Sequence, residues 1–296
     1  MALTGYGSVK PRPMPVTMDI VPSGAALAAE VRGVDLSEPL DDATFAAIER
    51  AYDEHGVIFF RDQRVTPEQQ VAFTRRFGEI AFNIFGERWS VPGNPEMVVV
   101  SNITEDGKPI GIRRAGETWH SDMSYTARPP RGTMLYAIET PELHGLPLGD
   151  TEFASAAAAW DALPETMRRH IDGRYAVFDF TRRTRSFPPT REEIERNPPV
   201  RHPIVRTHPK TGRKCLYVMR EDCTSIEGIA QEEAEVLICA LADHIVKPQF
   251  IYRHKWRPGD LLMWDNCTVQ HRAIQDYDLP LRRKMYRTTM GGSAPV

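Results

Sequence analysis

Residues 249–290 read QFIYRHKWRPGDLLMWDNCTVQHRAIQDYDLPLRRKMYRTTM. Aliphatic and aromatic residues are dense in three stretches of this segment, which predict strands over 249–256, 261–265 and 282–290. Residues 257–260, Arg-Pro-Gly-Asp, are typical of a turn that joins the first two strands. Short strands joined by tight turns indicate a sandwich or barrel of β-strands.

The same signal recurs through the rest of the chain, interrupted by a few helical stretches. Strands are also expected at 57–60, 97–101, 132–139, 174–180 and 214–219. Helices are expected at 41–54, from Thr66 to about Gly78, at 155–172 with an interruption at Pro164, and at 230–246. The pattern predicts a mainly β fold with flanking helices and a β-sandwich or jelly-roll core. A nucleotide-binding α/β sheet is not expected, because the sequence contains neither of the two glycine-rich phosphate-binding motifs, GxGxxG and GxxxxGK followed by Ser or Thr.

Length and composition indicate one folded domain. The chain has 296 residues, of which 41% are hydrophobic and 26% charged, and this is ordinary globular usage. Residues 1–16, which contain three prolines, are expected to form an extended tail, and 17–296 a single domain. A lid is expected around 80–117, and the segment 181–199, rich in Arg and Pro, is expected to be an insertion.

The charge balance bears on partners and location. With 37 Lys+Arg against 40 Asp+Glu, the net charge of −3 predicts neither nucleic acid nor a membrane as the main partner. No signal-peptide or membrane-spanning stretch is seen, so a cytoplasmic protein is expected. The four cysteines include no CxxC pair, which argues against a zinc ribbon and suits reduced thiols.

Two His-x-Asp triplets are the first candidates for chemistry. His170 and Asp172 fall at the end of an expected helix, where residues two apart point in different directions and cannot share a ligand. His120 and Asp122 fall in an extended segment, where residues two apart share a face. The second triplet can therefore direct an imidazole and a carboxylate at one metal ion.

His271, near the end of an expected strand, is the candidate for a third ligand. Two histidines and one carboxylate on one face hold non-haem Fe(II) and leave three coordination positions open. A single distant histidine is, however, more often a core or surface residue, so spacing alone leaves both interpretations open.

The expected strand 282–290 alternates, which places Arg283 and Arg287 on one face and Arg282 and Lys284 on the other. If the first face points inward, the two guanidinium groups lie about 13 Å apart in the interior, at the usual rise of a strand. Buried arginines require anions, and their planar donors suit carboxylates. A solvated edge strand fits the same alternation.

Several of these motifs occur together, in the same order and at similar spacing, in a known family. The chain resembles the taurine/2,4-dichlorophenoxyacetate dioxygenases, which are Fe(II)- and 2-oxoglutarate-dependent oxygenases, from about Ile20 to Gly291. The motifs are Trp119-His120-Ser121-Asp122, Gly149-Asp150-Thr151, Val205-Arg206-Thr207-His208-Pro209, residues 259–266, His271-Arg272 and Arg282-Arg283-x-x-x-Arg287.

The resemblance implies a double-stranded β-helix, the cupin-like jelly roll, with flanking helices. His120, Asp122 and His271 match the iron ligands, and Thr151 and Arg283 match the residues that bind 2-oxoglutarate. Arg287 matches an arginine close to the anion of the primary substrate. The implied reaction is hydroxylation of a small anionic substrate by O2, with release of succinate and CO2.

Departures from the family pattern bear on the substrate. Where enzymes acting on taurine carry His, Tyr and Asn, this chain has Asn83, Gly86 and Gly116, so taurine is not favoured. Residues 250–256 and 150–153 look more like the aryloxyalkanoate branch, so the expected substrate is a carboxylate or sulfonate of that kind. The lid is expected to place four aromatic or basic side chains near the site, although a solvated loop fits them equally well: Phe82, Phe85, Arg113 and Arg114.

Two other classes of function fit the same residues. A cupin-like protein could bind metal and 2-oxoglutarate without turnover, and a zinc hydrolase could use the same triad with a metal-bound water. Thr151 and Arg283 argue against the hydrolase, which has no use for a dicarboxylate clamp. A homodimer and a homotetramer are both compatible with the sequence.

Overall fold

The computed structural model describes residues 18–81, 87–183 and 188–296. The expected tail 1–16 and the lid residues Phe82 and Phe85 lie outside this part. The helices are α1 (Asp42–His55), α2 (Pro67–Arg76), α3 (Ala156–Asp161), α4 (Glu165–Ile171), α5 (Arg191–Arg196), α6 (Gln231–Ile245) and the 3-10 turns η1 (Glu87–Trp89), η2 (Phe180–Arg182) and η3 (Pro248–Phe250). The strands are β1 (Asp19–Pro22), β2 (Ala29–Arg32), β3 (Val57–Phe60), β4 (Ser90–Val91), β5 (Asn94–Ser101), β6 (Thr104–Glu105), β7 (Lys108–Pro109), β8 (Gly132–Glu139), β9 (Glu142–Leu143), β10 (Leu146–Pro147), β11 (Thr151–Ser155), β12 (Tyr175–Phe178), β13 (Val200–Pro203), β14 (Val205–Thr207), β15 (Lys214–Leu216), β16 (Cys223–Ile226), β17 (Ile251–His254), β18 (Leu261–Asp265), β19 (Val269–Ala273) and β20 (Lys284–Met290).

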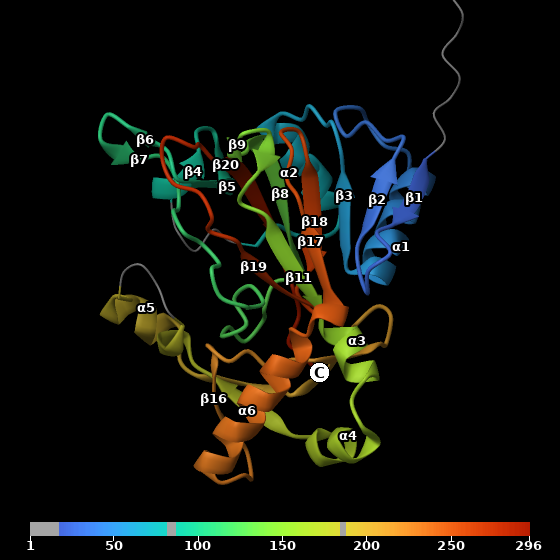
Figure 1. The fold of residues 1–296 in the computed structure, drawn as a ribbon, viewed down its shortest axis with the longest axis vertical. Helices are drawn as coiled ribbons and strands as arrows, with labels where there is room; N and C mark the ends of the chain where they lie inside the picture. Colours follow the sequence, from blue (N-terminus) through green and yellow to red (C-terminus); the bar gives the residue numbers. More distant parts are fainter. Residues whose placement is uncertain (1–17, 82–86, 184–187) are drawn as a thin grey trace, which may run out of the picture.

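An eight-stranded sheet forms the upper part of the molecule in Figure 1, in the order β1-β2-β3-β18-β8-β20-β5-β4. Alternate residues of its strands enter two different cores. In β18, Leu261 and Met263 pack in the cluster that includes residues of α1 and α2, such as Tyr52. Leu262 and Trp264 pack on the opposite face, against the second sheet. Both faces of this strand are therefore buried, which explains its continuous apolar run.

The second sheet has three strands in the order β17-β11-β19. Phe153 of β11 and Val269 of β19 join Leu135 of β8 and Met285 of β20 in one buried cluster. The two sheets thus face each other across this cluster, as in a β-sandwich. Among the described strands neither sheet closes on itself.

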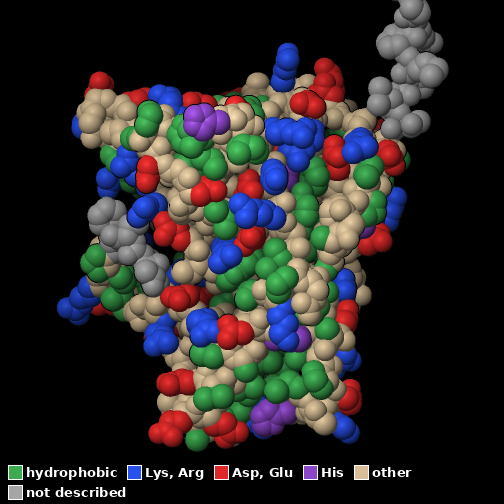
Figure 2. All heavy atoms as spheres, viewed as in Figure 1, with side chains coloured by type: hydrophobic (Ala, Val, Ile, Leu, Met, Phe, Trp, Pro, Cys, Tyr) green, Lys and Arg blue, Asp and Glu red, His purple; other side chains and the backbone are tan. Residues whose placement is uncertain are grey.

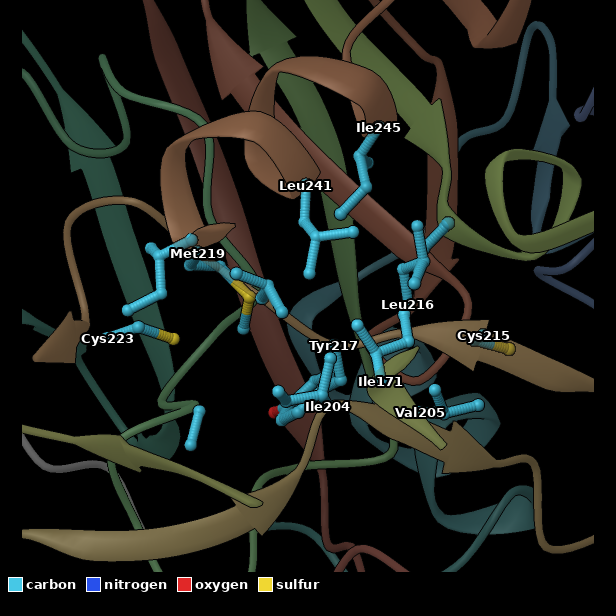
Figure 3. Close-up of a cluster of buried hydrophobic side chains, with 14 of the residues drawn as sticks. Ile171, Ile204, Val205, Cys215, Leu216, Tyr217, Met219, Cys223, Leu241 and Ile245 are labelled. Atoms are coloured by element: carbon cyan, nitrogen blue, oxygen red, sulfur yellow. The ribbon is translucent and has the colours of Figure 1, made fainter. Parts of the chain in front are cut away.

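The lower part of the molecule is built around helices and short strands (Figure 1). Helices α3, α4 and α6 share one apolar cluster with the sheet β13-β12-β16 and the hairpin β14–β15. Figure 3 shows its centre, where Leu241 and Ile245 of α6 face Ile204 and Leu216. This cluster supports the segment that follows β11, and so holds one end of the second sheet.

Most of the expected elements are confirmed. Thr66 caps α2 in a capping box with Gln69, and Gly56 ends α1 in the left-handed conformation. One prediction was too long, because the strand expected at 249–256 is confined to β17. The interruption expected at Pro164 is confirmed, since this residue precedes α4 and separates it from α3. The strand β5, expected at 97–101, lies within the range 80–117 expected for the lid, and the lid stays a prediction.

The surface agrees with the charge balance of the chain. Figure 2 shows basic and acidic side chains interspersed over one face, and no patch of a single sign dominates it. No helix in the described part of the chain is both long and apolar enough to cross a bilayer.

Candidate metal centre

His120, Asp122 and His271 converge between the two sheets. Their candidate ligand atoms all lie within 4.8 Å of one another, and all three residues are buried. Nε2 of His120 lies 3.8 Å and Nε2 of His271 lies 3.9 Å from Oδ1 of Asp122. These distances are too long for hydrogen bonds between the groups, yet one divalent cation could bridge them. Among the described residues this is the one cluster with this property.

The backbone brings the two histidines together. His120 and His271 form an isolated antiparallel bridge, in which each amide N–H donates to the carbonyl of the other at 3.1 and 2.8 Å. His271 is the third residue of β19 and pairs with Phe153 of β11. The expectation that it would lie near the end of a strand was wrong, because β19 is a separate strand of the second sheet.

Neighbouring groups fix the two imidazole rings. Nδ1 of His120 lies 2.8 Å from the carbonyl oxygen of Thr118, so this nitrogen carries the proton and Nε2 is free to bind a metal. The ring of His271 packs between Trp264 and Phe153, with centroid distances of 4.5 and 6.1 Å. Both rings are thus held with Nε2 toward the carboxylate.

Asp122 is held by three groups. Thr133 of β8 donates its hydroxyl hydrogen to Oδ2 at 2.6 Å, and the backbone N–H of Asp122 donates to Oδ1 of Asn266 at 3.2 Å. Nη2 of Arg287 lies 2.8 Å from Oδ1 of Asp122. The oxygen that faces the two histidines is therefore the one that also faces a guanidinium group.

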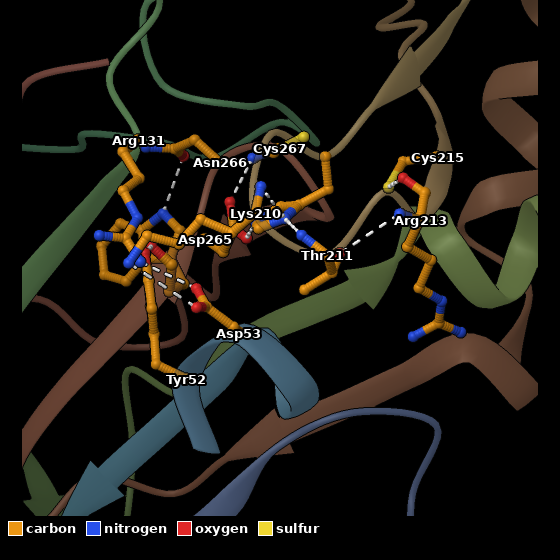
Figure 4. A network of polar contacts seen from close by, with 12 residues as sticks. Tyr52, Asp53, Arg131, Lys210, Thr211, Arg213, Cys215, Asp265, Asn266 and Cys267 are labelled. Atoms are coloured by element: carbon orange, nitrogen blue, oxygen red, sulfur yellow. Dashed lines mark hydrogen bonds and ion pairs between the residues drawn. The ribbon is translucent and has the colours of Figure 1, made fainter. Parts of the chain in front are cut away.

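Asn266 lies in the turn between β18 and β19, and a buried polar network fixes this turn (Figure 4). The backbone N–H of Asn266 donates to the backbone carbonyl of Arg131 at 2.9 Å, and the guanidinium group of Arg131 pairs with Asp53 of α1 at 2.8 Å. Nε2 of His208 lies 2.8 Å from Oδ2 of Asp265, a fully buried carboxylate. Helix α1 and the segment around His208 thus anchor the residue that binds the loop of Asp122.

Gly116 lies directly against His120. Its φ of +76° is in the left-handed region, and a Cβ built on it would lie 2.8 Å from Cε1 of His120. A side chain at this position is therefore disfavoured for two reasons: the left-handed backbone conformation strains any residue other than glycine, and His120 occupies the space that a Cβ needs. The glycine noted from the sequence as a departure from the taurine pattern permits this close approach.

Burial and charge set the protonation of the three candidate ligands. Burial lowers the pKa of His120, with a further contribution from Arg183, and it lowers the pKa of His271 well below the ordinary value. Burial alone would raise the pKa of Asp122, but Arg287 and the two histidines outweigh it, so this pKa is lowered. At neutral pH the site therefore holds two neutral imidazoles and one carboxylate, which are the forms that bind a metal.

Thr151 and Arg283 are the residues matched by resemblance to 2-oxoglutarate binding, and Thr151 pairs with Ala273, two residues beyond His271. Thr151 begins β11, is buried, and accepts a hydrogen bond of 2.9 Å from the indole of Trp256, which leaves its own hydroxyl hydrogen available. Arg283 is 5% exposed, and its Nε has no hydrogen-bond partner among the described residues. Burial raises the pKa of Tyr277, and the neighbouring guanidinium of Arg283 opposes that rise. A buried cation with an unused donor is suited to an anion.

The alternation expected in β20 is also seen. Arg287 and Met285 face the site and the second sheet, while Thr288 faces α2, where its hydroxyl lies 2.8 Å from that of Thr74. Arg287 lies on the face toward the site, whereas Arg283 precedes β20, whose pairing with β8 shifts register between Lys284 and Met285. Nε of Arg287, like that of Arg283, lacks a partner among the residues described.

The remaining candidates lie apart from the centre. His170 and Asp172 are exposed at the end of α4, and Asp172 pairs with Lys214 at 3.2 Å, as expected for a triplet without a metal. Arg113 and Arg114 are exposed; Arg113 donates to the carbonyl of Asn102 at 2.8 Å, and Arg114 lies 3.5 Å from Glu117.

Comparison with known proteins places this arrangement in a family. Residues 19–289 match the family model described as taurine catabolism dioxygenase TauD, TfdA family. The chain belongs to the TauD/TfdA family.

Its relatives in the TauD/TfdA family act on several anionic compounds. The chain is 36% identical to an alpha-ketoglutarate-dependent 2,4-dichlorophenoxyacetate dioxygenase of Cupriavidus pinatubonensis, over 91% of this chain and 96% of that protein. It is 30% identical to an alpha-ketoglutarate-dependent sulfate ester dioxygenase of Pseudomonas putida, over 96% and 93%. Both proteins are thus similar to this chain along nearly their whole length.

Solved structures of the TauD/TfdA type have the same architecture. AAD-2 in complex with Mn(II) and N-oxalylglycine superposes with a TM-score of 0.80 at 31% identity, over 94% of this chain and 98% of that one. A taurine dioxygenase from Burkholderia xenovorans gives 0.79 at 33% identity, over 94% and 92%. The mostly β fold with flanking helices is therefore that of TauD-like dioxygenases.

Sequence reasoning missed the residues that hold the candidate ligands. Thr133, Asn266 and Arg183 each contact the loop of Asp122 from a different segment. Thr133 lies on the same face of β8 as Leu135, so the strand alternation could have indicated a hydroxyl facing the second sheet. Nothing local in the sequence distinguishes Arg183 from the other arginines of its segment.

Proposed function

We propose that this protein is an Fe(II)- and 2-oxoglutarate-dependent dioxygenase that hydroxylates a small anionic substrate. The observation that carries the proposal is the convergence of His120, Asp122 and His271, buried and in metal-binding protonation states, in a chain of the TauD/TfdA family. The relatives named above are alpha-ketoglutarate-dependent dioxygenases, which supports the same reaction class here.

Three residues would hold the metal: Nε2 of His120, Oδ1 of Asp122 and Nε2 of His271. Two imidazoles and a carboxylate suit Fe(II) and leave positions for other ligands. When bound, the iron and 2-oxoglutarate together activate O2 and supply the oxidising power, with succinate and CO2 as by-products. The protein contributes binding, orientation and charge.

Thr151 and Arg283 would bind 2-oxoglutarate. Thr151 has a hydroxyl hydrogen to donate, and Arg283 has a buried cationic group whose Nε is unpartnered among residues 18–81, 87–183 and 188–296. Register supports the closeness of Thr151 to the metal, because Thr151 pairs with Ala273, two residues beyond His271. A dicarboxylate neutralises a buried guanidinium that otherwise lacks an anion.

Arg287 is the residue proposed to face the anion of the primary substrate. Fe(II) with Asp122 carries +1 and 2-oxoglutarate −2, so a further anion would be repelled unless another cation lay beside it. Arg287 has a partly exposed side chain, and its Nε has no hydrogen-bond partner in the part of the chain that the structure describes. A Cβ at Gly116 would lie 2.8 Å from His120, so the polar side chain expected here in enzymes acting on taurine has no room, which supports a substrate other than taurine.

Finer features of the architecture belong to the same proposal. The two facing sheets are consistent with a double-stranded β-helix, with residues 17–296 as one domain and 181–199 as an insertion. The lid would come from the parts of 80–117 that lie outside β5. Light scattering would distinguish a monomer from the dimer or tetramer that the sequence allows.

The test is anaerobic addition of Fe(II) and 2-oxoglutarate to metal-free protein, followed by a substrate screen. A visible absorption band that requires both additions is expected, and Asp122→Ala should abolish it. Succinate release would then be measured with 2,4-dichlorophenoxyacetate, phenoxypropionate, an alkyl sulfate ester and taurine. Turnover of taurine alone would contradict the substrate assignment.

Two other outcomes would replace the proposal. A band without succinate release from any anion would favour a metal- and 2-oxoglutarate-binding protein that has lost turnover. Tight zinc binding with no band would favour the hydrolase. Arg283 argues against the hydrolase, since hydrolysis by a metal-bound water makes no use of a buried cation placed for a dicarboxylate.

A further inference from the structure

Arg183 and Asp222 form a buried ion pair behind the metal-ligand loop 119–125. Nε of Arg183 donates to Oδ1 of Asp222 at 2.8 Å, and Nη2 donates to Oδ2, so the pair is bidentate. The Asp222 side chain is fully buried, and that of Arg183 is 15% exposed. The two residues come from different segments of the lower part of the molecule, since Arg183 follows η2 and Asp222 precedes β16.

The same guanidinium reaches the loop that carries Asp122. Its Nη2 also donates to the carbonyl oxygen of Ser121 and to Oγ of Ser124, both at 3.1 Å. Ser124 in turn donates its hydroxyl hydrogen to Asp222, and the guanidinium carbon lies 5.1 Å from the centre of the Tyr125 ring. One charged group is thus bonded to residues on both sides of the metal-ligand carboxylate.

The contact with Ser121 matters because of the peptide unit to which it belongs. The carbonyl of Ser121 and the N–H of Asp122 are the two ends of one planar peptide. Arg183 holds the carbonyl end, and Oδ1 of Asn266 holds the N–H end at 3.2 Å. Fixing this plane fixes the backbone direction from which the Asp122 side chain leaves.

We infer that Arg183, anchored by Asp222, is a positioning residue that sets the orientation of the metal-ligand Asp122. Its guanidinium bonds to the carbonyl of Ser121, and through it acts on the Ser121–Asp122 peptide. The inference rests on the proposed function, because it assumes that Asp122 binds a metal. Groups that orient metal ligands commonly contribute 10- to 100-fold to metal affinity.

A purely structural role is the competing explanation, and a double substitution separates the two. Removing one partner of a buried ion pair leaves an unpaired buried charge and destabilises the fold, whereas replacing both by apolar residues is often neutral. In Arg183→Met/Asp222→Met the buried charges are gone together with the hydrogen bond to Ser121. If the pair only supports the fold, this variant keeps normal metal affinity.

The experiment is titration of metal-free protein with Mn(II), followed by the electron paramagnetic resonance signal of the free ion, with thermal unfolding of each variant. We expect the double variant to bind Mn(II) 10- to 100-fold more weakly than the unsubstituted protein while its melting temperature stays within a few degrees. The matched control is Arg201→Met/Glu227→Met, an exposed pair at 2.6 Å, which should change neither quantity. Mn(II) affinity within twofold of the unsubstituted protein in the Arg183 double variant would overturn the inference.

A second variant covers the case in which the double variant does not fold. Arg183→Lys keeps a cation opposite Asp222 but loses the fork that reaches both Asp222 and Ser121. We expect weaker Mn(II) binding with retained folding, and unchanged binding would again overturn the inference. Failure of the unsubstituted protein to bind one Mn(II) would instead refute the proposed function, so the two failures are distinguishable.

Discussion

Gly116→Ala should weaken metal binding by displacing a ligand ring without unfolding the protein. The added Cβ would lie 2.8 Å from Cε1 of His120, where ordinary contacts are 3.4 Å or longer. The imidazole must therefore move by at least about 0.6 Å or rotate, because the backbone of Gly116 is held by its carbonyl, which accepts a 2.7 Å hydrogen bond from Ala273. Displacements of this size in a site built for one geometry typically reduce its function by up to about 100-fold.

The same substitution also introduces backbone strain, and a second glycine isolates that effect. Gly107 has a φ of +75°, nearly that of Gly116, but nothing lies within 4 Å of the Cβ that an alanine would add. Both variants should lose about 1–2 kcal/mol of folding stability from an alanine in the left-handed region. This corresponds to a melting temperature lower by roughly 2–8 °C for a chain of this size.

The assay is the Mn(II) titration described above, carried out on both variants and on the unsubstituted protein. We expect similar decreases in melting temperature for the two alanine variants, with affinity for Mn(II) about 10- to 100-fold lower for Gly116→Ala only. Equal Mn(II) affinities for Gly116→Ala and Gly107→Ala would refute the argument, because they would mean that the contact with His120 does not constrain the ring.

Three further changes have outcomes that follow from the contacts. Thr133→Val removes the 2.6 Å hydrogen bond to Asp122 and should weaken Mn(II) binding about 10-fold; affinity equal to that of the unsubstituted protein would show that other contacts fix the carboxylate. Arg283→Ala should raise the KM for 2-oxoglutarate by one to several orders of magnitude, since losing one partner of a buried charged pair costs about 2–5 kcal/mol. The control Arg282→Ala removes an exposed partner of Glu139 and should leave this KM unchanged. The same KM in both variants would mean that another residue binds the distal carboxylate. Burial lowers the pKa of His202, so this histidine is protonated at a higher pH in the unfolded chain than in the folded protein. The free energy of unfolding should therefore fall as the pH decreases from about 7 toward 5. Urea denaturation across that range gives the dependence of this free energy on pH, which should be weaker in His202→Phe.

Local patterns in the sequence predicted much of the fold. The apolar run of β18, the capping box at Thr66 and the glycine after α1 each determine their element through contacts within a few residues. The prediction that Arg283 and Arg287 share one face rests on the side-chain period of a strand, which is a property of the backbone, but β20 begins only at Lys284. The sequence could not show which face of β20 points inward, because that depends on how the strand packs against β8 and β11.

The groups that fix the candidate ligands could not be predicted in this way. His271 lies in a strand whose sequence, Val-Gln-His-Arg-Ala, has little apolar character, and it is held there by pairing with β11. Asn266 and Arg183 contact the Asp122 loop across 144 and 62 residues of chain. Such contacts are set by tertiary packing, and the residue types involved are common on any protein surface.

The backbone bridge between His120 and His271 has a consequence for how the protein handles its metal. Closing a loop of roughly 150 residues costs about 4 kcal/mol of chain entropy, and the two backbone hydrogen bonds of this bridge, with the pairing of β19 to β11, help to offset that cost. Metal binding therefore does not have to bring these two segments together, so the free energy of metal binding appears as affinity for the metal rather than as folding energy. A chelator should therefore strip the site and leave a folded apoprotein, and cycles of demetallation and reloading should be fully reversible, unlike those of a zinc finger, whose fold exists only with its metal.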